Sequence, residues 1–231
     1  MTRVIFTFIF LITTSLSLYP NDLFVGFKQN AKGEYELSEV VTNNISGEMQ
    51  YSNAQEWIAK SFGDYKKVIQ FENKETLKLI MKGSTDLGVF QKGYLLGIDL
   101  TRWYKLHFII TIECKDSKFR YSITDIETAS CSNDEAYIDG GLGYRLENIS
   151  KQERYLKDAE EQLAELNDLD IESMKKKAKK ELEKKRKSLI QHIDSHKRNI
   201  KEENDWLVKE VGVIRMLGKS LKDAISTDNN F

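Results

Sequence analysis

Two histidines one helical turn apart are the residues of this sequence best placed to hold a metal ion. His192 and His196 stand at positions i and i+4 of a segment with helical periodicity, so both imidazoles share one face and could supply two zinc or copper ligands. A zinc site needs further ligands, and no glutamate follows His192 in the metalloprotease manner. In the alternative interpretation His196 lies in an apolar helix seam and His192 is solvated, and we expect neither a metal nor a cofactor.

No other pattern predicts catalysis. The run Gly140-Gly141-Leu142-Gly143 has the composition of a phosphate loop, but it has the spacing of neither a dinucleotide-binding nor a Walker motif, and it is more typical of a flexible turn. The sequence contains no nucleophile elbow and no cysteine and histidine at a local catalytic spacing. We therefore expect a protein that is not an enzyme.

The most strongly charged segment is KKKAKKELEKKRK at 175–187, with nine basic residues among thirteen. Such a run could bind anionic lipid headgroups, nucleic acid or an acidic partner. It lacks interleaved aromatic residues that would stack on bases, and its glutamate–lysine pairs at i and i+4 are typical of a solvated helix surface. Over the whole chain 35 basic residues balance 36 acidic ones, so we expect no nucleic-acid partner.

Residues 1–17 have the pattern of a cleavable signal peptide. Arg3 precedes a run at 4–12 that is apolar except for Thr7, and Ser15 and Ser17 occupy the −3 and −1 positions of a small-residue cleavage site. The apolar run is too short to span a bilayer. We expect export to the periplasm or cell envelope with cleavage near Ser17, and no transmembrane span in the mature chain.

An oxidising compartment would permit one disulfide between the two cysteines, Cys114 and Cys131. The predicted strands place these residues at opposite ends of a hairpin, which is too far apart for good disulfide geometry. The sequence leaves the pairing open.

The chain after the signal peptide divides into a leader segment at 18–34, an α+β domain at 35–148 and a charged helical tail at 149–231. Within the domain, alternation predicts a strand at 35–41. Apolar spacing predicts a helix at 52–62, which begins at a Ser52–Gln55 capping box and ends at Gly63.

Two hairpins follow that helix. In the first, a three-residue loop at 73–75 would pair Phe71 with Leu77. In the second, every other residue from Tyr104 to Cys114 is apolar, and a turn at Asp116-Ser117 would place Ile112 opposite Tyr121 and Glu113 opposite Arg120.

The segments around these hairpins are less regular. Residues 83–103 predict either a loop or a short extra strand pair, and residues 128–148 have the composition of a loop.

The polar side of the second hairpin predicts a possible binding face. Its residues are Lys105, His107, Ile109, Thr111, Arg120, Ser122 and Thr124. Either the tail helices cover this face or it is free to bind a partner.

The tail has helical periodicity with two apolar stripes, one at 156–166 and one at 207–225. Between them, 167–170 predicts a break with Asp170 as the next N-cap, and 189–200 continues a heptad-like, coiled-coil-like seam. Each stripe must be buried against the domain, a neighbouring helix or another chain. A protein partner or a homo-oligomer formed through the tail is therefore one expectation.

The stretches YSNAQEWIAKSF (51–62), KKVIQFENKETLKLIMKG (66–83) and HFIITIECKDSKFRYSITDIE (107–127) resemble a family of exported bacterial domains of unknown function with a TATA-binding-protein-like fold. The resemblance covers roughly residues 35–127. It implies a β-α-β4-α antiparallel sheet domain and an envelope location, and it implies no activity.

Two hypotheses on function follow. In the first, the chain is an exported cell-envelope protein that acts as a non-enzymatic interaction or self-association module. In the alternative, it is a small-ligand or lipid-binding domain with a pocket between the sheet and a tail helix.

Overall fold

The computed structural model describes residues 23–228, except 92–93, 96–97, 100–101 and 133–134. Side chains are described over the same range except at 89–102 and 131–139. The predicted signal peptide at 1–17 lies outside the described residues.

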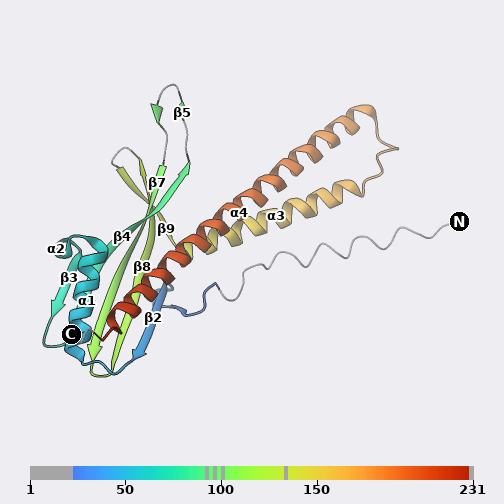
Figure 1. The fold of residues 1–231 in the computed structure, drawn as a ribbon. Helices are drawn as coiled ribbons and strands as arrows, with labels where there is room; N and C mark the ends of the chain where they lie inside the picture. Colours follow the sequence, from blue (N-terminus) through green and yellow to red (C-terminus); the bar gives the residue numbers. More distant parts are fainter. Residues whose placement is uncertain (1–22, 92–93, 96–97, 100–101, 133–134, 229–231) are drawn as a thin grey trace.

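A twisted antiparallel sheet forms the body of the molecule, and a helical hairpin projects from it (Figure 1). The strands are β1 (Phe27–Gln29), β2 (Tyr35–Thr42), β3 (Ile69–Asn73), β4 (Lys78–Gln91), β5 (Tyr94–Leu95), β6 (Ile98–Asp99), β7 (Arg102–Lys115), β8 (Lys118–Ser132) and β9 (Glu135–Gly141). The helices are α1 (Gly47–Phe62), α2 (Tyr65–Val68), α3 (Leu142–Asn167) and α4 (Lys176–Ile225). The main sheet has the order β1-β2-β8-β7-β4-β3, with β9 beside β8. The predicted α+β architecture with a long C-terminal helix is confirmed.

The β7–β8 hairpin has the predicted register. Ile112 lies opposite Tyr121, and Glu113 lies opposite Arg120. Arg120 Nε donates to Glu113 Oε2 over 2.8 Å, which is the expected cross-strand ion pair. The turn is tight because Ser117 adopts a positive φ of 64°. One side of both strands is buried and the other is open, as alternation requires.

The β3–β4 hairpin differs from its predicted register. Phe71 pairs with Ile80 rather than Leu77, and a bulge separates it from Ile69. The connection is longer than expected because Asn73 Oδ1 accepts a hydrogen bond from the backbone N–H of Thr76, and Leu77 takes a positive φ of 50° to complete the turn. The local turn chemistry therefore sets the register, in place of apolar matching.

The two irregular segments belong largely to strands. β4 and β7 remain paired as far as Gln91 and Arg102, and the short β5–β6 pair follows, so the strand-pair alternative for 83–103 is correct. The loop expected at 128–148 is wrong, because β8 runs to Ser132, β9 pairs back along it and α3 already begins at Leu142. Pairing with β7 holds the small polar residues of β8 in the sheet despite their composition.

The first helix also begins earlier than predicted. Its N-cap is Ser46, whose Oγ accepts from the Met49 N–H over 3.3 Å, so the expected capping box at Ser52 is wrong. Gly63 ends the helix with a φ of 70°, as expected. The leader segment is likewise more ordered than its composition indicates, because β1 lies within it and pairs with β2.

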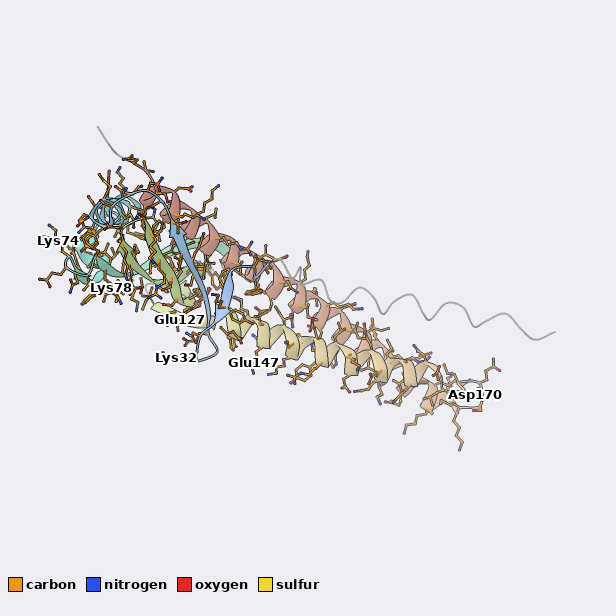
Figure 2. The ribbon with its side chains drawn as sticks, turned by 90° about the horizontal axis from the view of Figure 1, so that it is seen from below. Lys32, Lys74, Lys78, Glu127, Glu147 and Asp170 are labelled. Carbon is orange, nitrogen blue, oxygen red and sulfur yellow. The ribbon has the colours of Figure 1, made fainter. Side chains whose placement is uncertain are left out.

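The tail is one helical hairpin whose second arm continues into the domain (Figure 2). α3 ends at Asn167 where a break is predicted, but α4 begins after Lys175 and not at Asp170. α4 is a single helix of 50 residues, about 75 Å long at the usual rise. Its first half packs along α3, and its second half lies on the sheet.

The two predicted stripes therefore have different burial partners. Leu156 of α3 and Ile193 of α4 are buried in the seam of the hairpin. Leu207, Ile214 and Ile225 are fully buried in the main core. α1 lies beside this part of α4, and the Trp57 Nε1–H donates to Ser220 Oγ over 3.0 Å.

Cys114 is a buried free thiol, and burial raises its pKa to about 12. The register places Cys114 opposite Phe119, whereas Cys131 lies opposite Trp103 at the other end of the hairpin. None of the described helices carries an apolar stretch long enough to cross a bilayer.

The core role of α4 gives a first prediction. Ile214→Ala should lower the free energy of unfolding by about 2–5 kcal/mol, because Ile214 is fully buried and the substitution leaves a cavity. Met216→Ala on the same helix should cost less than about 0.5 kcal/mol, because Met216 is 66% exposed. Urea unfolding followed by circular dichroism measures both values. Equal effects would contradict the placement of α4.

Candidate functional site

The structure brings the predicted binding face together on one side of the sheet. On this face Ile109 of β7 lies opposite Thr124, and Thr111 lies opposite Ser122. His107, Ile109 and Thr111 are half-buried by their strand neighbours. In the described part of the chain, α1 and the second half of α4 lie on the opposite side of the sheet, so the tail does not cover this face (Figure 1).

This face also contains apolar residues that the sequence interpretation missed. Val40 of β2 pairs with Arg120 and is 60% exposed, while Phe71 of β3 reaches the face through its pairing with Ile80 and is 44% exposed. Phe71 was missed because its predicted register was wrong. The face is thus a mixture of small polar side chains and single apolar ones.

Three charged side chains of the face are paired with one another. Glu113 contacts Lys78 and Arg120 from the two neighbouring strands, and the hydrogen bonds from Arg120 and Lys78 lower the pKa of its carboxyl group. Partial burial and the nearby charge of Lys82 lower the pKa of His107. This imidazole therefore stays neutral to lower pH than a free histidine.

The two histidines of the tail do not meet further ligands. His196 Nδ1 lies 2.7 Å from Gln152 Oε1 of α3, and its ring lies 5.7 Å from that of Tyr155. His192 is exposed. Across the described residues, no three histidine, cysteine, aspartate or glutamate side chains are grouped closely enough to bind a metal.

The basic run occupies the exposed start of α4, at the end of the hairpin farthest from the sheet. Lys184 pairs with Glu181, and Lys179 Nζ lies 3.4 Å from the Glu172 carbonyl. Arg186 is the part of the run that reaches α3, where its Nη2 donates to the Leu166 carbonyl. The run is thus available to solvent along most of its length.

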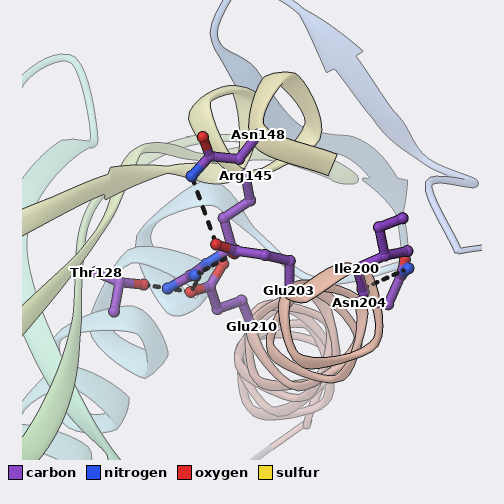
Figure 3. A network of polar contacts seen from close by, with 7 residues as sticks. All are labelled: Thr128, Arg145, Asn148, Ile200, Glu203, Asn204 and Glu210. Carbon is purple, nitrogen blue, oxygen red and sulfur yellow. Dashed lines mark hydrogen bonds and ion pairs between the residues drawn. The ribbon is translucent and has the colours of Figure 1, made fainter. Parts of the chain in front are cut away.

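A buried polar network joins the sheet to both arms of the hairpin (Figure 3). Arg145 of α3 donates from Nε to Glu210 Oε1 over 2.6 Å and from Nη1 to Glu203 Oε2 over 2.9 Å. The Thr128 hydroxyl of β8 donates to the same Glu210 oxygen. Asn148 Nδ2 lies 3.4 Å from Glu203 Oε1. The Glu210 carboxylate of α4 therefore connects β8 and α3.

Burial and charge act against each other in this network. Burial raises the pKa of Glu210, while Arg145 and Thr128 oppose that change. Burial by itself would lower the pKa of Arg145, but Glu210 and Glu203 outweigh it and raise that pKa. Arg145 therefore stays charged, and its charge is neutralised inside the protein.

An open cleft of about 340 Å³ lies beside the network, between β7, α3 and α4. It is lined by Tyr104, Tyr144, Arg145, Asn148, Gln152, Asn199, Glu202, Glu203 and Trp206. The Tyr104 and Trp206 rings contact each other, with centroids 4.7 Å apart. The cleft lies between the sheet and the tail helices, where the ligand-binding hypothesis places a pocket.

The sequence interpretation missed this site for two reasons. Arg145 lies in a segment with loop composition, so it was not assigned to a helix. Glu210 lies three residues after Leu207 and four before Ile214, inside an apolar stripe. That acidic residue at a core position was the available signal.

The network gives a second prediction. Arg145→Leu should destabilise the fold by about 3–5 kcal/mol, because it leaves the buried carboxylate of Glu210 without its cation. Adding Glu210→Leu should recover part of that loss, since the unpaired charge is removed. Urea unfolding of the double-mutant cycle measures the coupling. The exposed pair Lys157–Glu161 is a control, where the same cycle should give less than about 1 kcal/mol.

Comparison with known proteins bears on the sheet domain. Two solved structures are each similar over 87% of this chain. The first is a DUF4468 family protein from Bacteroides ovatus, with a TM-score of 0.47, 14% sequence identity and 92% of that chain covered. The second is a TBP-like protein from Parabacteroides distasonis, with a TM-score of 0.45, 15% sequence identity and 97% of that chain covered. No curated protein matches. Residues 38–129 match the family described as "Domain of unknown function (DUF4468) with TBP-like fold". The resemblance carried by residues 51–127 is thus confirmed as a match to the DUF4468 family, whose description gives a TBP-like fold.

Proposed function

We propose that the protein is exported to the periplasm or cell envelope and acts there as a non-enzymatic interaction module. In this proposal the projecting hairpin of α3 and α4 presents a surface to a protein partner or to a second copy of the chain. The observation that carries the proposal is the continuity of α4. One helix leaves the sheet, where it is part of the core, and extends outward with α3 as its neighbour.

The junction makes the hairpin a fixed extension of the domain. Arg145, Glu203 and Glu210 connect α3, α4 and the sheet through short, mostly buried contacts. A buried network of this kind fixes one arrangement, because any other arrangement would leave a charge unpaired. A partner bound at the far end would therefore be held in a defined position relative to the sheet.

The projecting part carries apolar side chains that its own seam does not bury. Ile190 of α4 and Tyr155 of α3 are each 48% exposed, and Leu169 in the connection is 43% exposed. Single apolar side chains are common on surfaces, but aromatic and aliphatic groups among charged neighbours are also the usual anchors of an interface. These three residues are our choice for contacts with a partner.

Self-association gives a third prediction. Light scattering on residues 18–231 should give a mass above that of one chain. Replacing residues 158–192 by a short Gly-Ser linker should give a monomer that still unfolds cooperatively, because the core stripe at 207–225 is kept. Ile190→Ser with Leu169→Ser should shift the full-length protein toward the monomer, whereas Met216→Ser on the sheet half of α4 should not. A monomeric full-length chain would reject self-association through the hairpin.

Export gives a fourth prediction. Expressed with its full sequence in a bacterial host, the protein should appear in the envelope fraction with a new N-terminus at Leu18. Ile9→Arg should keep the uncleaved chain in the cytoplasm, because a charge interrupts the apolar run that is recognised. Ser17→Ala should still be cleaved, since alanine is small enough for the −1 position. An unprocessed wild-type chain that begins at Met1 would contradict export.

A further inference from the structure

We propose that the cleft between β7, α3 and α4 binds a neutral, hydroxyl-rich small molecule, such as a saccharide or another polyol. This site goes beyond the interaction role proposed for the hairpin, because it lies at the base of the hairpin and not along its projecting part. Its volume of about 340 Å³ falls within the usual range for small-molecule sites.

The first argument is the change of chemistry along the seam between α3 and α4. Farther out, the seam is apolar, and Leu156 of α3 and Ile193 of α4 are both buried there. At the cleft the side chains are amides instead: Asn148 and Gln152 on α3, and Asn199 on α4. Each carboxamide offers both donors and an acceptor, and so does each hydroxyl group. Amides from two helices can therefore form more hydrogen bonds with a ligand that carries several hydroxyl groups than with a ligand that carries a single charged group.

The second argument is the aromatic wall. Tyr104 and Trp206 line the cleft, where the Trp206 indole is 7% exposed and lies against Tyr104, Arg145 and Lys209. Tyr144 is the most exposed ring of the lining, with 53% of its surface accessible. Tyrosine and tryptophan combine a flat apolar surface with a polar group at the ring edge. A saccharide ring has the same combination, with C–H groups on its faces and hydroxyls around its edge. Amides beside aromatic rings thus complement both parts of such a ligand.

The third argument concerns charge. The only cation among the lining residues, Arg145, directs its donors to Glu203 and Glu210, and its side chain is 9% exposed. The remaining charged lining residue, Glu202, is acidic and exposed. An anionic ligand would find no unpaired cation in this lining. An acyl chain would cover the polar ends of these amides without forming any hydrogen bond to them, which is costly.

The network beside the cleft fixes the shape of the site. Glu203 receives Arg145 Nη1 on one carboxylate oxygen and lies near Asn148 Nδ2 with the other. The Gln152 carboxamide is held by His196 of α4, whose Nδ1 lies 2.7 Å from Gln152 Oε1. Side chains held in this way are already positioned before a ligand arrives, which reduces the entropy cost of binding.

The test is a titration of the mature protein, residues 18–231, with maltotriose, chitobiose and myo-inositol, followed by calorimetry and by NMR saturation transfer. At least one of the three should bind with a Kd of about 1 mM or tighter. Asn148→Ala with Asn199→Ala should weaken that binding by about tenfold or more, because each change removes hydrogen bonds to the ligand. Gln162→Ala, an amide on the same helix α3 but outside the cleft lining, is the matched control and should leave the affinity unchanged.

Two further probes separate this proposal from its competitors. Inorganic phosphate and octanoate should not compete with the saccharide, and binding of either one at the cleft in place of all three polyols would overturn the assignment. The Ile190→Ser variant should bind the saccharide normally, so the site can fail or succeed independently of self-association. Thermal unfolding of each variant shows that any lost binding is not a loss of fold. No binding by any of the three polyols would also overturn the proposal.

Discussion

The structure depends on the burial of one sheet face by two helices from distant parts of the chain. α1 covers part of that face, but the final apolar stripe of α4 completes it, with Leu207, Val211 and Leu221 fully buried. Burial of such side chains is the main stabilising term in a domain of this size. The second half of α4 is therefore as necessary to the sheet as its own strands. A truncation before α4 would expose the apolar side of β7 and β8.

The hairpin is a consequence of the same constraint. The chain leaves β9 at one end of the sheet and must return to cover it, and it does so through α3 and the whole length of α4 (Figure 1). The fully buried side chains of α4 come from its second half, which lies on the sheet. The first half pairs with α3 through a narrower seam, and the two parts meet at Arg145 and Glu210. Because the junction is charged and buried, it fixes the angle of the hairpin without adding much net stability.

The sequence predicts those parts of the fold in which one periodicity acts alone. Alternation from Tyr104 to Ile123 gives the β7–β8 register correctly, because a one-residue slip would turn an entire apolar face to solvent. The helical stripe at 207–225 is predicted for the same reason. The predictions fail where a local hydrogen bond or a long-range strand pairing determines the bounds or the register of an element. Asn73 sets the β3–β4 turn, Ser46 begins α1, and β8 recruits the polar β9.

The two candidate sites, the sheet face and the cleft, also differ in how well the sequence predicts them. The sheet face at 105–124 is visible in the sequence, because residues on one side of a strand are two apart. The cleft is not, since it unites β7, the start of α3 and the middle of α4, which are separated by about half of the described chain. The one local sign is Glu210 inside an apolar stripe. A carboxylate at such a position must have a buried partner, and in this fold that partner could come only from an element packed on the same helix. An acidic residue that interrupts a core stripe is therefore an indication of a second, polar site beside the apolar core.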